Sequence, residues 1–168
     1  STQVKEAQDR VRTALKNNGI ALPPKRITVN LAPADIRKEG AGFDLPLAAA
    51  VLAAAGVLSA EQLGNVMMAG EIGLNGEIHA VSGILPMIIR AREEKCRFCV
   101  VPYDNLKEAH LIPDMKVIGV ADLQEMIRYV SAPDSYKKAV ETGKKSPQEN
   151  SVDFCEIHGQ ESLKRAVE

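Results

Sequence analysis

An apolar run from Leu45 to Leu58 is the feature that most constrains how this chain can fold. The run is too short to cross a bilayer, so it predicts a buried helix over Leu45–Ala55 and not a membrane span. This helix has no polar face and is expected to be buried on nearly all sides. Asp44 is expected to act as its N-cap and Gly56 to end it.

The residues around this helix alternate between helical and extended patterns. Amphipathic spacing predicts a helix over residues 3–18, and a β-branched run predicts a strand over Arg26–Leu31. Asn75-Gly76 indicates a hairpin turn between Val66–Ala69 and Glu77–Val81. The elements expected after the hairpin are a helix over 84–94, a strand over 98–102, a short helix capped by Asp104, a strand over 117–120 and a helix capped by Asp122 that ends near Tyr129. This alternation predicts parallel βαβ units and therefore a mixed α/β, or α+β, fold.

The chain is expected to hold one main domain and the start of another. Its 168 residues fit a domain of ordinary size with a remainder. Residues 132–151 are rich in lysine and proline and poor in apolar residues, so they predict a linker after a domain over residues 1–131. Residues 152–168 then begin a new segment. Because Ser1 is not a methionine and a helical face already starts at Val4, the chain is expected to begin inside its first domain.

Charge and cysteine usage exclude several classes of protein. The net charge of -1 gives no long-range field toward nucleic acid or an anionic membrane, so any such binding would need a local patch. The odd set Cys96, Cys99 and Cys155 argues against a disulfide scaffold and for a reducing compartment. No signal peptide is visible, and we expect a cytoplasmic protein with no membrane partner.

Three features invite a functional reading and also have a structural one. The loop Lys38–Asp44 carries two glycines before a helix, so it could hold an anion on free N–H groups or could be a tight turn. It lacks the Gly-Lys-Ser/Thr of a Walker A loop. Cys96 and Cys99 have CxxC spacing, but a structural zinc needs four ligands, so we expect structural thiols and no metal site. His79 alternates with apolar residues and is expected at a surface or an interface.

Small basic doublets are the sequence signal for nucleic acid. Any one of them is explained as solvated surface, and together they could line a nucleic-acid path. The doublets are Lys25-Arg26, Arg37-Lys38, Lys137-Lys138 and Lys144-Lys145. The candidate nucleic-acid residues are Lys25, Arg26, Arg37 and Lys38.

Four stretches of the chain resemble the magnesium-chelatase-like AAA+ ATPases of the ComM/YifB family. They are Val4–Ile20, Arg26–Leu47, Gly70–Leu85 and Val152–Val167, and they are spread along nearly the whole length of the chain. The resemblance implies an N-terminal domain with the Lon protease-like fold, which is also the fold of the second domain of ribosomal protein S5. It implies that the first strands of that domain precede residue 1. It also implies that residues 152–168 open an ATPase domain whose Walker A motif would follow residue 168.

The resemblance further implies that peptidase chemistry has been lost. Lon proteases use a Ser-Lys dyad, with the serine in a loop before a buried helix and the lysine in the helix after the hairpin. The matching positions here are Gly42 and Leu85. Since glycine has no hydroxyl and leucine has no base, no catalytic residue is expected in this chain.

By the same resemblance, the full-length protein is expected to be an ATPase that binds ATP and Mg and assembles into a ring, a hexamer. Its expected partner is DNA, on which it would act as a helicase or branch-migration motor in recombination or natural transformation. Ile157, His158 and Gly159 match the segment beside the adenine and would contribute only in the full-length protein, so no cofactor is expected in this chain alone. Two alternatives are a chelatase-type motor that remodels a protein and an unconventional peptidase. A basic cluster would favour DNA, and an apolar face would favour a protein partner.

Overall fold

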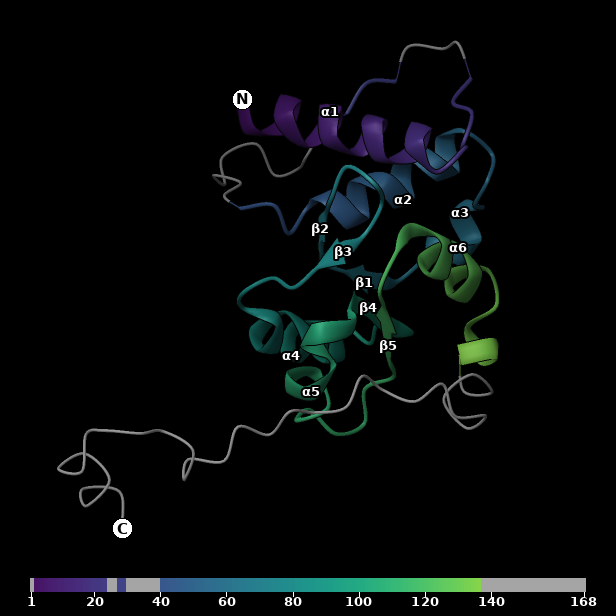
Figure 1. Ribbon diagram of the computed structural model, residues 1–168. Coiled ribbons are helices and arrows are strands. Elements are labelled where there is room, and N and C mark those ends of the chain that lie inside the picture. Colours follow the sequence, from purple (N-terminus) through teal and green to yellow (C-terminus); the bar gives the residue numbers. More distant parts are fainter. Residues whose placement is uncertain (1, 24–26, 30–39, 137–168) are drawn as a thin grey trace, which may run out of the picture. The chain divides into compact units, whose positions relative to one another are not determined.

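Two helices, α1 (Thr2–Asn17) and α2 (Asp44–Ala54), lie against each other in one layer (Figure 1). This computed structural model describes residues 2–23, 27–29 and 40–136. α1 confirms the helix expected over residues 3–18. The apolar stripe that it buries against α2 consists of Ala7, Val11, Ala14 and Leu15.

α2 is the apolar helix expected over residues 45–55, and Gly56 follows its end with a φ of +80°. Its buried residues are Asp44, Leu45, Leu47, Ala48, Ala49, Val51 and Leu52. The expectation that nearly all its sides are buried is wrong, because Ala50 and Ala54 are exposed. An exposed alanine leaves little apolar area in water, so an apolar sequence can have an open face at low cost.

Three parallel strands form the larger sheet, in the order β1-β4-β5. They are β1 (Val66–Met68), β4 (Phe98–Pro102) and β5 (Val117–Val120). In register, Val66 faces Phe98 and Val100 faces Ile118. The connecting helices include α4 (Ile84–Glu93) between β1 and β4, and α5 (Leu106–Ala109) between β4 and β5. The predicted parallel βαβ arrangement is therefore confirmed.

A two-stranded antiparallel hairpin, β2 (Glu71–Ile72) with β3 (Ile78–His79), lies between α2 and the larger sheet (Figure 1). The Asn75-Gly76 turn is confirmed, with Gly76 at a φ of +91°. The pairing expected for Val66–Ala69 is wrong. The strand there, β1, pairs with β4 and not with the hairpin strand β3. Pattern alone cannot separate a hairpin strand from a neighbouring sheet strand, since both are short apolar runs.

Two further local predictions fail and one holds. Within the expected strand 26–31, the described residues 27–29 belong to no strand, because no described segment supplies them with ladder hydrogen bonds. Asp104 lies inside the 3-10 helix η1 (Tyr103–Asn105) and caps no helix with its side chain. Asp122 does cap α6 (Leu123–Ser131), since its Oδ1 accepts from the backbone N–H of Glu125 at 2.8 Å.

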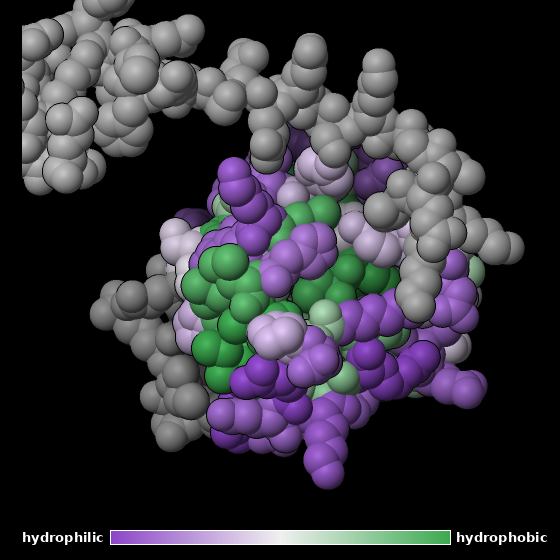
Figure 2. Space-filling view, turned by 90° about the horizontal axis from the view of Figure 1, so that it is seen from below, coloured by the Kyte–Doolittle hydropathy of each residue, from purple (hydrophilic) through white to green (hydrophobic). Residues whose placement is uncertain are grey.

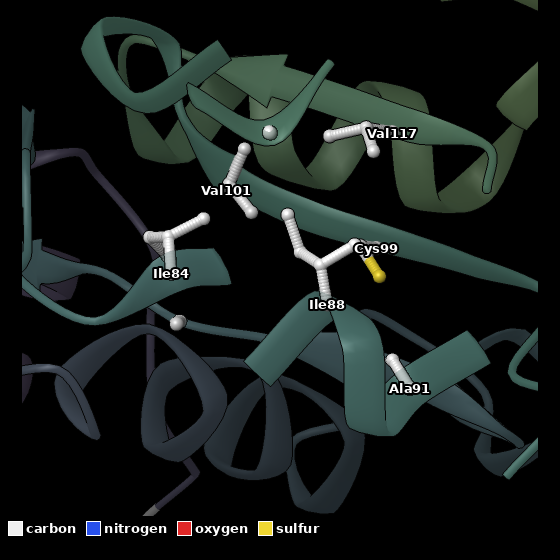
Figure 3. Packing of buried hydrophobic residues seen from close by; sticks show 8 residues of the cluster. Ile84, Ile88, Ala91, Cys99, Val101 and Val117 are labelled. Atoms are coloured by element: carbon white, nitrogen blue, oxygen red, sulfur yellow. The ribbon is translucent and has the colours of Figure 1, made fainter. Parts of the chain in front are cut away.

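A cluster of buried hydrophobic residues forms where α4 packs on the parallel sheet (Figure 3). Ile84 and Ile88 of α4 are fully buried against Cys99 and Val101 of β4. A short helix, α3 (Ala60–Leu63), closed by a capping box at Ser59, precedes β1. None of the helices in the described ranges has the length and apolar character needed to cross a membrane.

The described chain ends just after α6. Tyr136 stacks edge-on against Tyr129 with ring centroids 5.1 Å apart, and its hydroxyl accepts from the backbone N–H of Gly119 at 3.3 Å. Burial raises the pKa of the Tyr136 phenol. The linker is expected over residues 132–151, but residues 133–136 are helical. The rest of the expected linker and the expected segment 152–168 lie outside the described residues.

Candidate functional site

The loop before α2 is joined by backbone hydrogen bonds to the turn between β1 and β2. The carbonyl of Gly42 accepts from the N–H of Gly70, and the carbonyl of Gly70 accepts from the N–H of Leu45, both at 3.0 Å. A Cβ on Gly70 would lie 3.1 Å from side-chain carbons of Leu45 and Ile78, so any other residue there would have to displace these side chains by a few tenths of an ångström. The tight-turn reading of residues 40–44 fits this geometry, because N–H groups of the loop and the first turn of α2 already have partners.

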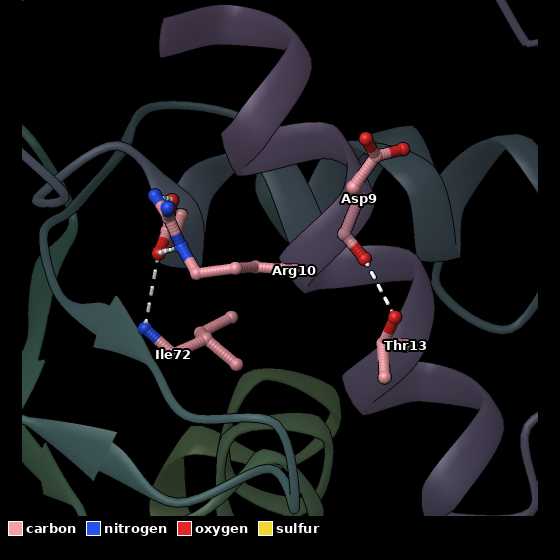
Figure 4. Close-up of polar contacts among 5 residues, drawn as sticks. Asp9, Arg10, Thr13 and Ile72 are labelled. Carbon is pink, nitrogen blue, oxygen red and sulfur yellow. Dashed lines mark hydrogen bonds and ion pairs between the residues drawn. The ribbon is translucent and has the colours of Figure 1, made fainter.

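Asp44 lies at the centre of this region. Its carboxylate is fully buried and accepts two hydrogen bonds from the guanidinium of Arg10 on α1, each of 3.0 Å (Figure 4). The same carboxylate accepts from the backbone N–H of Ile72 at 3.3 Å. The hydrogen bond to Asp44 raises the pKa of Arg10. One ion pair therefore joins α1, α2 and β2.

The expectation that Asp44 is the N-cap of α2 is wrong. Phe43 occupies the cap position and makes no side-chain cap hydrogen bond, while Asp44 is the first helical residue. The carboxylate still lies near the positive end of the helix, where a negative charge is favourable. It points to Arg10 instead of to the free N–H groups of its own helix, because a bidentate charged pair is the stronger interaction.

Asn105 fixes the segment that leads from the hairpin to α4. Its side-chain amide donates to the carbonyl of Val81 and accepts from the N–H of Val81, each at 3.0 Å. Asn105 is buried, and its amide provides both backbone groups of Val81 with the hydrogen-bond partners that a neighbouring strand would otherwise supply. Sequence patterns give no signal for this contact, because its two members are 24 positions apart.

The resemblance matches Gly42 and Leu85 to the Lon dyad, and the loop that carries Gly42 approaches Val81, which lies four positions before Leu85. A Cβ placed on Gly42 would lie 3.8 Å from Cγ1 of Val81. Leu85 follows four positions later, in the first turn of α4, and is half-buried. If the resemblance holds at these two positions, a glycine and a leucine stand where acyl-transfer chemistry needs a hydroxyl and a base.

Gly42 and Gly40 give a matched pair of substitutions. Gly42 has no positive φ and has space around its Cβ position, so Gly42→Ser should change the free energy of unfolding by less than about 0.5 kcal/mol. Gly40 has a φ of +79°, so Gly40→Ser should cost about 1–2 kcal/mol through backbone strain. Urea unfolding of the two variants checks this. A greater loss from Gly42→Ser than from Gly40→Ser would contradict the geometry.

The remaining sequence candidates are scattered. Cys99 is fully buried in β4, and burial raises its pKa to about 12, so its thiol is held in the neutral form that suits a structural role. His79 is exposed on β3, as expected of a surface residue. Within the described ranges, no cluster of three or more potential metal ligands occurs. The nucleic-acid candidates (Lys25, Arg26, Arg37 and Lys38) and the adenine-segment candidates (Ile157, His158 and Gly159) lie outside the described residues.

Apolar side chains are also exposed on the face that carries α4 and α5, among charged ones (Figure 2). Met87 and Ile89 of α4 are 40% and 38% exposed, and Leu111 after α5 is 68% exposed. The polar side of α4 carries Arg90, which pairs with Glu93 and Glu94.

Comparison with known proteins places the chain in a family. The family described as subunit ChlI of Mg-chelatase matches residues 1–105. Competence protein ComM of Haemophilus influenzae is 39% identical over 168 residues, which are 98% of this chain and 33% of that protein. The YifB protein of Escherichia coli is 36% identical over 167 residues, 99% of this chain and 33% of YifB. Lon protease 2 of Bacillus subtilis is 27% identical over 128 residues, 75% of this chain and 22% of that protease.

The chain therefore belongs to the family of subunit ChlI of Mg-chelatase, and ComM and YifB are its homologues. It spans about a third of the length of these two relatives. The resemblance read from the sequence is confirmed. The similarity to a Lon protease is more distant and covers 75% of this chain, whose described part has a mixed α/β fold.

Proposed function

We propose that residues 1–131 form a Lon protease-like domain, of the fold shared with the second domain of ribosomal protein S5, that performs no peptide hydrolysis. The observation that carries the proposal is the residue types at the two positions that the resemblance matches to the Lon dyad. The loop before α2 presents Gly42, and α4 presents Leu85. The distant similarity to Lon protease 2 supports the fold assignment. The scaffold is then used for assembly or guidance and not for acyl transfer.

An assay of peptide hydrolysis tests the lost chemistry. The chain should leave casein and fluorogenic peptides intact, and a serine-reactive probe should label no site stoichiometrically, because Gly42 and Leu85 cannot form a nucleophile and base. Gly42→Ser is the matched control for the scaffold, since it restores the hydroxyl without the base. Stoichiometric labelling of the unaltered chain would show that other residues act as a peptidase.

The full-length protein is proposed to be a cytoplasmic AAA+ ATPase that forms a hexameric ring and acts on DNA in recombination or natural transformation. The support is homology to a protein named for competence, together with membership of a Mg-chelatase subunit family. In this proposal ATP and Mg are held outside the described residues, with Ile157, His158 and Gly159 beside the adenine. Lys25, Arg26, Arg37 and Lys38 are the proposed phosphate contacts of this chain.

The motor proposal is tested on a protein of the relatives' full length that carries this chain. Its rate of ATP hydrolysis should rise when single-stranded or forked DNA is added, since a DNA motor couples hydrolysis to its track. An unchanged rate with every DNA form, together with a rise on adding a protein substrate, would support a protein-remodelling motor instead. The exposed apolar residues of α4 favour that second candidate, because apolar patches mark protein contacts.

A further inference from the structure

The chain that follows α1 turns back and leaves a groove along one edge of that helix. Gly19, with a φ of +72°, makes the turn, and the N–H of Ile20 donates to the carbonyl of Leu15 at 3.0 Å. The groove has a volume of about 370 Å³ where Arg12, Thr13 and Lys16 face the returning chain. The returning chain contributes Ile20, Ala21 and Leu22.

A second hollow of about 120 Å³ extends the groove toward α2. It shares Arg12 and Leu22 with the first, so the two hollows form one groove. Its other lining residues are Gln8, Val11, Ile27 and Val51. Among the described residues, no aromatic side chain lines either hollow, so this part of the chain offers no platform on which nucleic-acid bases could stack.

One edge of the groove is basic. Lys5, Arg12 and Lys16 are spaced at seven and four positions, which places all three on one stripe of α1. Of the acidic residues of the helix, Glu6 falls on another edge, whereas Asp9 lies on the same stripe between Lys5 and Arg12, so the stripe carries three cations and one carboxylate. Arg12 and Lys16 are exposed and have no ion-pair partner among the described residues. The net charge of the chain is -1, so this stripe is a local feature and not part of a general excess of positive charge.

We propose that this groove is a docking site for a peptide segment of a protein partner that combines large apolar residues with carboxylates. Leu22, Ile27 and Val51 receive the apolar side chains, and Arg12 and Lys16 pair with the carboxylates. Charge complementarity selects the partner, since two cations that lack partners beside an apolar floor favour an acidic amphipathic segment. A phosphate backbone would gain from the cations but would leave the apolar floor uncovered. The site does not depend on whether the full-length protein acts on DNA.

The test is a titration of the isotopically labelled 168-residue chain, followed through its backbone amide resonances. The probes are a leucine–glutamate amphipathic peptide, its leucine–lysine counterpart of equal length, and single-stranded oligothymidine. The acidic peptide should shift the amides of residues 8–22, and this binding should weaken as salt is added. The lysine peptide and the oligonucleotide should leave those amides in place.

Matched charge reversals locate the site. Arg12→Glu should weaken binding of the acidic peptide by about tenfold, whereas Arg92→Glu, the same change on the exposed face of α4, should leave it unaltered. Leu22→Ser should weaken binding at any salt concentration, because it removes the apolar floor. The dispersed amide spectrum of each variant verifies that it is folded. Equal binding of the lysine peptide, an equal effect of Arg92→Glu, preferential binding of oligothymidine or no response to the acidic peptide would each overturn the proposal.

Discussion

Arg10→Met should lower the free energy of unfolding by about 3–5 kcal/mol, because it leaves the fully buried carboxylate of Asp44 without its counter-charge. Methionine retains much of the length and apolar character of the arginine stem, so the loss reports mainly on the charge. Arg12→Met is the matched control on the same helix. Arg12 is exposed and has no ion-pair partner among the described residues, so its replacement should change stability by less than about 0.5 kcal/mol.

Urea denaturation of two further variants separates charge from packing. Asp44→Asn alone, and the double variant Arg10→Met with Asp44→Asn, complete a thermodynamic cycle with the unaltered chain. The double variant should be more stable than Arg10→Met alone, since it no longer buries an unpaired charge. If Arg10→Met costs no more than Arg12→Met, the pair contributes little, and α1, α2 and β2 are held by their apolar contacts alone.

Leu52→Ala should lower the free energy of unfolding by about 2–5 kcal/mol, through lost burial and the cavity left behind. Leu52 and Leu45 of α2 are fully buried, and Leu47 and Val51 are nearly so. This confirms the set of core residues expected from the sequence. Leu111→Ala is the control, because that leucine is 68% exposed and its truncation should change stability by less than about 0.5 kcal/mol. Similar losses from the two substitutions would mean that α2 is peripheral to the folded core.

The sequence by itself determined the elements whose signal is local. Strand β4, strand β5 and helix α4 begin and end within a residue of their expected bounds, since an apolar run between turn residues carries its own period and ends. The Asp122 cap is equally local, because the carboxylate bonds an N–H three residues away. Parallel pairing followed from the alternation of strands and helices, which leaves few other topologies. Resemblance, and not periodicity, identified the family.

Only the tertiary structure decided the contacts between distant positions. Arg10 and Asp44 are 34 positions apart, and a first-turn aspartate is more often read as a cap than as half of a buried ion pair. The hairpin partner of β3 is β2, a strand of two residues and too short to carry a period. The docking groove arises because Gly19 turns residues 20–22 back against the basic edge of α1. A sequence pattern fixes which face of an element is apolar, but which elements cover that face depends on packing across the whole chain.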